Sequence, residues 1–342
     1  MVKKIFLTAS LILFLTDIFC QSKDSYNVAF NEIDKMLKGE AKLDFKKAVF
    51  LTENAHYANK LDYREFCQKI DDIETRLNQF RQVKGIINHP IGKQFAIFNY
   101  MMEPSKFNDN IHLTYDFEDL IGDKDWTKMF VSKLLRTKTG NCHSLPYLYK
   151  ILAEEIGAEA YLALAPNHLY IKHKDDKGLW VNLELTSGTF PRDGWLISSF
   201  SITTQAIKKE TYLEALTLKE SVALTLCDLA LGYKFSFGHD DFTLKCCNTV
   251  IEYFPKCVNT YMIKNELLAE KRKVLLSANN QKRPEISKLE KSITDLYQKI
   301  DEMGYKDMPK EQYQQWVNYI ENQRKKQQAK ETTIDNAKTN KK

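Results

Sequence analysis

The chain has 342 residues, of which 43% are hydrophobic and 12% aromatic, enough for about two domains with a substantial core. Its formal net charge is +5: residues 1–20 contribute +1 from two lysines and one aspartate, and residues 321–342 contribute +4 from seven basic and three acidic residues. The residues between them sum to zero, which excludes nucleic acid from the expected partners.

The first twenty residues have the pattern of a secretory signal peptide. Two lysines precede an apolar run over residues 5–15, and the segment ends Phe19-Cys20-Gln21. The run is too short to cross a membrane, and no other part of the sequence has as long an apolar stretch as a span needs. We therefore expect cleavage before Gln21, export to the periplasm or the extracellular space, and no stable membrane span. The alternative is a lipoprotein with its lipid on Cys20, against which the bulky Phe19 argues.

Residues 21–94 read as a helical N-terminal region. Apolar residues recur at three- and four-residue spacing in three successive stretches, and His89-Pro90-Ile91-Gly92 interrupts the pattern. The spaced apolar positions are Val28, Ile33, Met36 and Leu37, then Ala48, Val49, Leu51 and Ala55, then Phe66, Ile70, Ile73, Leu77 and Phe80.

A cysteine precedes the next strongly amphipathic stretch. Cys142 follows Thr139-Gly140-Asn141, and a helix with one apolar face is predicted to end at Gly157. The Pro146 ring would clash with the Cys142 carbonyl in a regular helix, so we expect Cys142 at the cap or in the first turn. A helix N-terminus favours a thiolate and can hold an oxyanion. The alternative is a buried, inert cysteine. The apolar face consists of Leu145, Leu148, Tyr149, Leu152 and Ile156.

Beyond Gly157 the period changes to that of strands. Residues 158–165 are small and apolar, residues 169–174 and 179–185 alternate apolar with polar, and KDDKG at 174–178 is a hairpin turn. A turn centred near residue 176 pairs His168 with Glu184 across the two strands, on one face and roughly 5 Å apart at Cβ. A thiol, a base and an acid thus occur in the order that nucleophilic catalysis uses.

This stretch resembles the transglutaminase-like core of the papain-like cysteine superfamily, from about Phe95 to Phe190. The resemblance lies in a G-x-C-x-S signature, a Gly-Ala-x-A step after the helix, a histidine on a strand, and W-x-x-L-E-x-T on the next strand. The matching residues are Gly140, Cys142 and Ser144; Gly157, Ala158 and Ala160; His168; and Trp180, Leu183, Glu184 and Thr186.

The resemblance implies roles for individual residues. Cys142 would be the nucleophile, His168 the base and Glu184 the group that orients the ring. The family has aspartate where this chain has Glu184, so Asn182, on the same strand face, is an alternative orienting group, as an asparagine is in papain. Leu169 stands where an aromatic residue commonly follows the family histidine.

Residues 205–326 are predicted to be helical. Helices over 221–233 and 242–254 form a pair that resembles a tetratricopeptide repeat, and we expect a short appendage that binds a protein partner. Helical patterns continue over 259–276 and 285–326. The basic residues 327–342 are expected to be a disordered tail. Trp195 lies in the loop that precedes residues 205–326. We expect it to fill the core, and the alternative is that it lines a substrate cleft.

Six cysteines remain after the predicted cleavage. The four over residues 227–257 lie close in sequence, and either one disulfide or buried thiols would suit them. No C-x-x-C or H-x-x-x-H spacing occurs, so no metal site and no cofactor are expected. Asp116, Glu118 and Asp119 lack an EF-hand pattern and are expected in a solvated loop.

These features predict an α+β protein in which the Cys142 helix packs on an antiparallel sheet, flanked by helical regions. The predicted units are a signal peptide at 1–20, helical residues 21–94, a transglutaminase-like core at 95–204, helical residues 205–326 and the tail at 327–342. The expected function is thiol-dependent acyl transfer, or hydrolysis of an amide, on a peptide or protein substrate. The alternative is an inactive scaffold on the same core that recruits partners through its helical C-terminal region.

Overall fold

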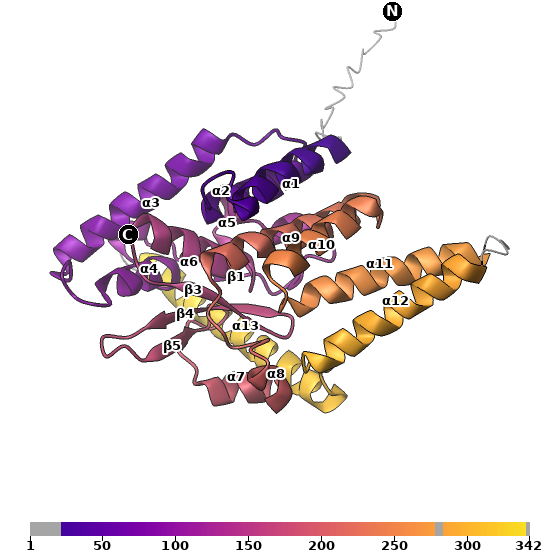
Figure 1. Ribbon diagram of the computed structural model, residues 1–342. Helices are drawn as coiled ribbons and strands as arrows, with labels where there is room; N and C mark the ends of the chain where they lie inside the picture. The colour runs from indigo at the N-terminus through magenta and orange to yellow at the C-terminus, as the bar shows by residue number, and fades with distance from the viewer. Residues whose placement is uncertain (1–21, 278–282, 340–342) are drawn as a thin grey trace, which may run out of the picture.

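A computed structural model describes residues 22–277 and 283–339 of the chain. Helices make up most of this part, together with an antiparallel three-stranded sheet and a short parallel strand pair (Figure 1). At this level the predicted mixture of helices and sheet is confirmed. The predicted signal peptide lies outside the described residues.

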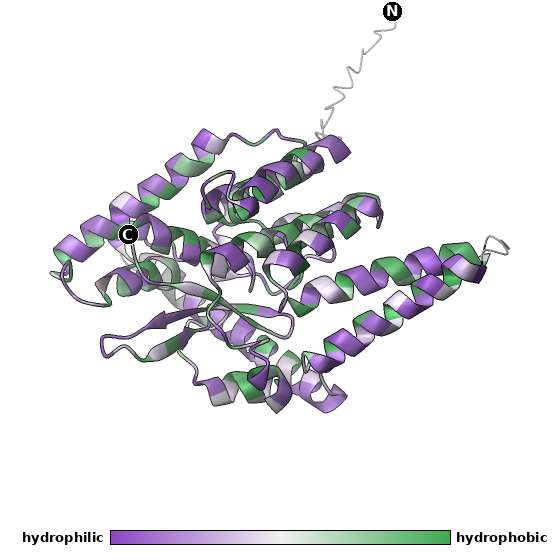
Figure 2. Ribbon diagram, viewed as in Figure 1, coloured by the Kyte–Doolittle hydropathy of each residue, from purple (hydrophilic) through white to green (hydrophobic). Residues whose placement is uncertain are grey.

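The three predicted N-terminal helices are present. They are α1 (Lys23–Lys38), α2 (Phe45–His56) and α3 (Tyr63–Val83), followed by α4 (Gly92–Met102). The side chains of Ser22, Asp44 and Asp62 accept hydrogen bonds from backbone N–H groups in the first turn of α1, α2 and α3. The apolar positions predicted for these helices are buried, except Val28. The apolar residues of these helices therefore face inward. Figure 2 colours the ribbon by hydropathy, and hydrophobic and hydrophilic residues are interspersed along the helices.

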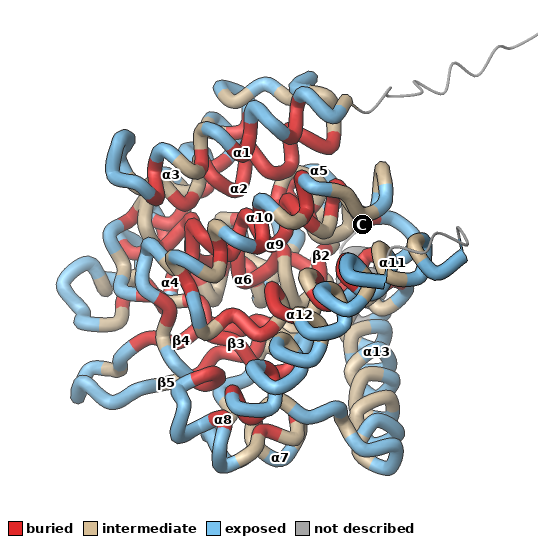
Figure 3. Tube along the Cα trace, turned by 45° about the vertical axis from the view of Figure 1, so that its right-hand side comes forward, coloured by how far each residue is buried: buried red, intermediate tan, exposed pale blue. Residues whose placement is uncertain are grey.

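The small sheet forms the middle of the chain. Strands β3 (Tyr161–Ala165), β4 (His168–Lys174) and β5 (Trp180–Leu183) are antiparallel neighbours in that order. Helix α6 (Ser144–Glu155) packs against β3 and β4, and both the helix and these strands are largely buried (Figure 3). Two-residue strands β1 (Thr114–Tyr115) and β2 (Thr139–Gly140) pair in parallel beside them.

The hairpin register differs from the predicted one by two residues. Lys174 pairs with Trp180 and Ile171 with Leu183, because the turn closes by a hydrogen bond from the Asp175 N–H to the Leu179 carbonyl. Glu184 lies just beyond the paired part of β5 and bridges to Thr189 instead. Direct pairing of His168 with Glu184 is therefore wrong, but a shift of two residues leaves both on the same face.

The remaining elements are mostly helices. They are the short helices η1 (Lys106–Asn108) and η2 (Trp126–Met129), then α5 (Val131–Thr137), α7 (Asp193–Ser199), α8 (Thr204–Lys208), α9 (Leu218–Phe237), α10 (Asp241–Tyr253), α11 (Val258–Ser277), α12 (Arg283–Glu302) and α13 (Lys310–Thr339).

Helix α9 belongs to the core, contrary to the prediction of a helical appendage. Almost every residue from Ser221 to Ala230 is buried, and α9 contacts α1, α2 and α10. A helix that is apolar on all sides must be covered on all sides. The hairpin of α11 and α12 instead projects from the body of the molecule (Figure 1).

The prediction of a disordered tail from residue 327 is wrong as far as Thr339. Helix α13 continues through these residues and lies along β1. The Gln327 side-chain amide accepts from the Tyr115 N–H at 2.8 Å and donates to the Tyr115 carbonyl at 3.2 Å. Lys330 donates to the Met102 carbonyl and pairs with Glu103. Composition alone gave no sign of these contacts.

No helix among the described residues combines the length and apolar character needed to cross a membrane.

Candidate active site

Cys142 lies where the sequence predicted it, immediately before the first turn of α6. Strand β2 leads into it, and the Asn141 carboxamide oxygen accepts from the N–H groups of His143 at 3.0 Å and Ser144 at 3.1 Å. Asn141 thereby caps the start of the helix. Pro146 is the third residue of α6, in the first turn, where a residue without an N–H group is tolerated. The cysteine is partly exposed.

His168 opens β4 and faces Glu184. Its Nε2 lies 2.5 Å from Glu184 Oε2, and the other carboxylate oxygen of Glu184 accepts from the Thr186 N–H at 2.8 Å. The ring of Phe200 stacks on the imidazole, with ring centres 4.6 Å apart. The carboxylate and the stacked ring fix the histidine in one orientation.

Cys142 and His168 influence each other's pKa. Burial acts to raise the pKa of the Cys142 thiol, but a hydrogen bond from His168 and its positive charge outweigh burial, so the net pKa is lowered. Burial acts to lower the pKa of His168, yet the Glu184 charge and hydrogen bonds with Cys142 and Glu184 raise it to about 10. The arrangement thus favours a thiolate beside an imidazolium at neutral pH.

Glu184 remains a carboxylate in this setting. Burial alone would raise the pKa of its side chain, but the charge and hydrogen bond of His168 and the bonds to Thr186 lower the pKa overall. Thr186 lies two residues further along the chain, so the local backbone itself holds the carboxylate in place.

Asn182 is not part of this group. Its amide nitrogen donates to the Pro191 carbonyl at 3.1 Å and to Asp193 at 2.7 Å. In the observed register Asn182 pairs with Lys172, four residues beyond His168 on β4. The alternative in which Asn182 orients the histidine is therefore not what the structure shows.

Tyr115 is a site residue that the sequence did not reveal. The parallel pairing of β1 with β2 places it beside Gly140, two residues before the cysteine. Burial and the nearby Cys142 and Glu184 raise the Tyr115 pKa well above its usual value, and the phenol hydrogen-bonds with Cys142. Tyr115 therefore presents a neutral O–H donor to the sulfur. Its only sequence signal was a tyrosine at the edge of an acidic stretch.

His143 adjoins Cys142 in sequence but has other partners. Its Nδ1 lies 2.9 Å from the Met129 carbonyl, and its Nε2 lies 3.1 Å from Asp228, which also accepts from the Tyr147 hydroxyl. These contacts tie the start of α6 to η2 and α9.

Two of the three acidic residues after β1, Asp116 and Asp119, are not solvated as expected, whereas Glu118 is exposed. Asp116 is buried and pairs with Lys128 at 3.0 Å and Lys133 at 3.4 Å. Asp119 is also buried and accepts from the N–H groups of residues 123–125. Both carboxylates are satisfied within the protein, which the sequence pattern could not show.

A cavity of about 760 Å³ adjoins the site. Tyr115 and Thr186 form part of its wall next to the cysteine and the glutamate, and Trp195 lines another side. Trp195 thus takes the role that the sequence analysis held as the alternative. Helix α13 contributes Tyr319 and Gln327, so this helix closes one side of the cavity.

The six cysteines that the structure describes are free thiols. The sequence left open whether the four cysteines over residues 227–257 form one disulfide or remain buried thiols. The structure shows buried thiols at Cys227, Cys246, Cys247 and Cys257. Only Cys67 and Cys142 are partly exposed.

Comparisons of the chain with models of known protein families, with curated proteins and with solved structures give no match.

Proposed function

We propose that this protein is a thiol-dependent acyl-transfer enzyme of the transglutaminase-like kind, acting on an amide in a peptide or protein. The proposal rests on the contact of 2.5 Å between the His168 imidazole and the Glu184 carboxylate, together with the lowering of the Cys142 pKa by His168. A nucleophile, a base and a group that orients the base are the parts that acyl transfer through a thioester needs. The resemblance seen in the sequence assigns the same three residues to the same roles.

The reaction follows from the protonation states. The Cys142 thiolate adds to the carbonyl carbon of the substrate, and the electron pair of the C=O bond moves to oxygen. When the C–N bond breaks, the leaving amine takes its proton from the His168 imidazolium, which leaves a Cys142 thioester and a neutral imidazole. Water or a second amine then adds to the thioester, with His168 accepting its proton, and the thiolate is released.

Two groups support the negative oxygen that forms in this step. Tyr115 is a neutral phenol that influences the Cys142 pKa and can donate its O–H, and the N-terminus of α6 carries partial positive charge. The cavity beside them has room for several residues of an extended peptide, and its walls include Trp195, Phe190 and Arg192. A peptide segment is therefore a better fit than a small metabolite.

A generic acyl donor tests the proposal without knowledge of the substrate. We expect p-nitrophenyl acetate to give a burst of nitrophenol equal to the amount of protein, with acetate on Cys142 by peptide mass spectrometry. Cys142→Ala removes the nucleophile, so the burst disappears. Adding a primary amine then separates transamidation from hydrolysis by the product formed. A wild-type protein that releases nitrophenol no faster than Cys142→Ala would rule out the enzyme.

The competing proposal is a scaffold without chemistry, which recruits partners through the helical C-terminal region. The observation in its favour is the projecting α11–α12 hairpin, which carries exposed Val274, Leu276 and Tyr297. A stoichiometric burst on Cys142 contradicts this alternative, because a scaffold has no need of an activated thiol.

Export is proposed from residues 1–20 alone. Expression of the full chain with its own N-terminus in a secreting host is expected to give mature protein that begins at Gln21 in the exported fraction. Intact-mass measurement and N-terminal sequencing check this. Lipid on Cys20 would instead support the lipoprotein alternative, and full-length protein confined to the cytosol would contradict both.

A further inference from the structure

His239 is a partly exposed residue whose side chain is buried and makes no hydrogen bond among the described residues. It lies in the turn between α9 and α10, next to Gly238, whose φ of +75° suits a glycine. Its side chain is 2% exposed, and neither ring nitrogen has a hydrogen-bond partner among the described residues. Buried polar groups are nearly always satisfied, so a buried imidazole that makes no hydrogen bond points to a ligand site.

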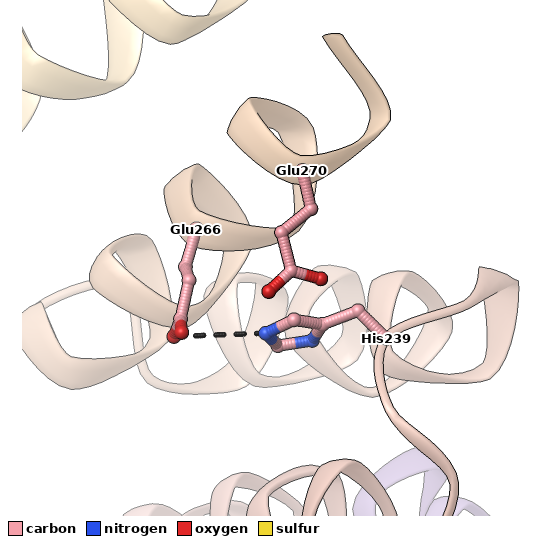
Figure 4. A group of neighbouring side chains, drawn as sticks. All are labelled: His239, Glu266 and Glu270. Carbon is pink, nitrogen blue, oxygen red and sulfur yellow. Dashed lines mark ion pairs between the residues drawn. The ribbon is translucent and has the colours of Figure 1, made fainter. Parts of the chain in front are cut away.

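Two carboxylates lie opposite this ring. Glu266 and Glu270 are four residues apart on α11 and so project from one face of the helix toward His239 (Figure 4). His239 Nε2 is 3.6 Å from Glu266 Oε2, and one atom from each of the three residues lies within 4.8 Å of the others. Two like charges held this close to each other favour a cation between them.

A neighbouring lysine orients one of the two carboxylates, and a cleft beside the three residues provides space for an ion. Lys234 pairs with the second oxygen of Glu266 at 2.5 Å, which orients the carboxylate so that Oε2 faces the histidine. A cleft of about 320 Å³ is lined by His239 and Glu270, by apolar residues of α11 and α12, and by Lys271, whose ammonium group pairs with Asp241 at 2.6 Å. Water molecules can therefore complete the coordination of an ion.

We propose that His239, Glu266 and Glu270 bind a divalent first-row transition metal ion, with zinc as the reference ion. One imidazole nitrogen and two carboxylate oxygens suit Zn²⁺, whereas Ca²⁺ and Mg²⁺ take oxygen ligands alone. Tetrahedral zinc with bonds of about 2.0–2.2 Å sets its ligand atoms roughly 3.4 Å apart. The observed 3.6 Å from His239 to Glu266 is already close to this value, and side-chain rotation of exposed Glu270 closes the rest.

The bound ion would join the α9–α10 turn to the middle of α11 and so restrain the α11–α12 hairpin. The sequence analysis expected no metal site because it looked for ligands in short spacings. Here the histidine and the first glutamate are separated by 27 positions, from 239 to 266, and only the packing of α11 on α10 brings them together.

The test is a zinc titration of the full chain carrying Cys142→Ser, which removes the thiolate at the candidate active site as a competing ligand. Isothermal titration after removal of metal is expected to give one zinc per chain. Adding His239→Gln or Glu270→Gln to this parent is expected to weaken zinc binding at least tenfold, about the loss seen for changed metal-site residues. His89→Ala, at an exposed histidine in a loop, is the matched control and keeps parental affinity.

Glu270→Gln keeps the shape of an exposed side chain, so it separates lost ligation from lost folding. Cobalt in place of zinc adds a spectroscopic readout, since nitrogen and oxygen ligands give no thiolate charge-transfer band. Thermal unfolding of the parent is expected at a higher temperature with zinc, and the shift is lost in both variants. Zinc affinity unchanged in either variant, or no binding by the parent at micromolar zinc, would overturn the proposal.

Discussion

Replacing His168 with alanine is expected to slow the labelling of Cys142 by iodoacetamide at pH 6 at least about tenfold, because an ordinary thiol with a pKa near 8.5 is less than about 1% ionised there. In the wild-type protein His168 lowers the pKa of the thiol, so the thiolate persists as the pH falls below 9. Without His168, burial raises the pKa, and labelling should become fast only on the alkaline side. The measurement is the rate of Cys142 alkylation against pH, read by peptide mass spectrometry.

Two further variants identify the group that supports the histidine. Glu184→Gln removes the charge that raises the His168 pKa, so Cys142 labelling at pH 6 should fall in the same direction as with His168→Ala. Asn182→Ala is the matched control on the same strand, because its amide bonds to Pro191 and Asp193. Cys67, which is also partly exposed, is the internal reference in each sample. Equal Cys142 labelling in wild type and His168→Ala would mean that the thiol is not activated.

Replacing Glu53 with alanine is expected to lower the free energy of unfolding by about 3 kcal/mol, since it leaves one buried and one partly buried N–H group without acceptors. Glu53 lies on α2, is fully buried, and accepts from the N–H groups of Val131 at 2.6 Å and Ser132 at 2.9 Å. It thereby caps α5, whose own N-cap residue supplies no side-chain bond. Urea unfolding followed by circular dichroism measures the change.

Glu53→Gln is the matched variant for this prediction. Glutamine keeps one carbonyl oxygen for one of the two N–H groups but turns an N–H₂ toward the other. Its loss of stability should lie between wild type and Glu53→Ala. A Glu53→Ala protein as stable as wild type would contradict the assigned capping role. Loss of the α5 cap should also disturb the candidate active site, because α5 and β2 lead directly to Cys142.

The parts of the fold that the sequence predicted best are those that depend on hydrophobic periodicity and on the chemistry of single residues. The spaced apolar residues of α1, α2 and α3 are buried as the helical pattern required, and Pro146 placed Cys142 at the helix start. The alternation of β4 and β5 brought His168 and Glu184 to one face, although the turn geometry moved the pairing by two residues. Such a shift depends on where the hairpin closes, which side-chain alternation does not encode.

Long-range contacts account for what the sequence did not show. Tyr115 reaches Cys142 only through the β1–β2 pair, which joins segments about 25 residues apart by two residues on each strand. Helix α13 docks on Tyr115 through the single side chain of Gln327, within a stretch whose charge is typical of solvated tails. Polar contacts of this kind leave no periodic mark in a sequence.

The burial of α9 between α1, α2 and α10 has a kinetic consequence. The Tyr26 hydroxyl lies 3.3 Å from the Ser236 hydroxyl, and the Thr52 hydroxyl donates to the Thr225 carbonyl at 3.3 Å. The two contacts join residues that are 210 and 173 positions apart in the sequence. Helices α1 and α2 pack on each other, but until α9 is synthesised and docks, the apolar surface that they present to α9 has no partner. Loops of this length close slowly. Helices α1 and α2 leave the ribosome first but complete their packing only after α9 has been synthesised. During this interval the nascent chain is most prone to aggregation.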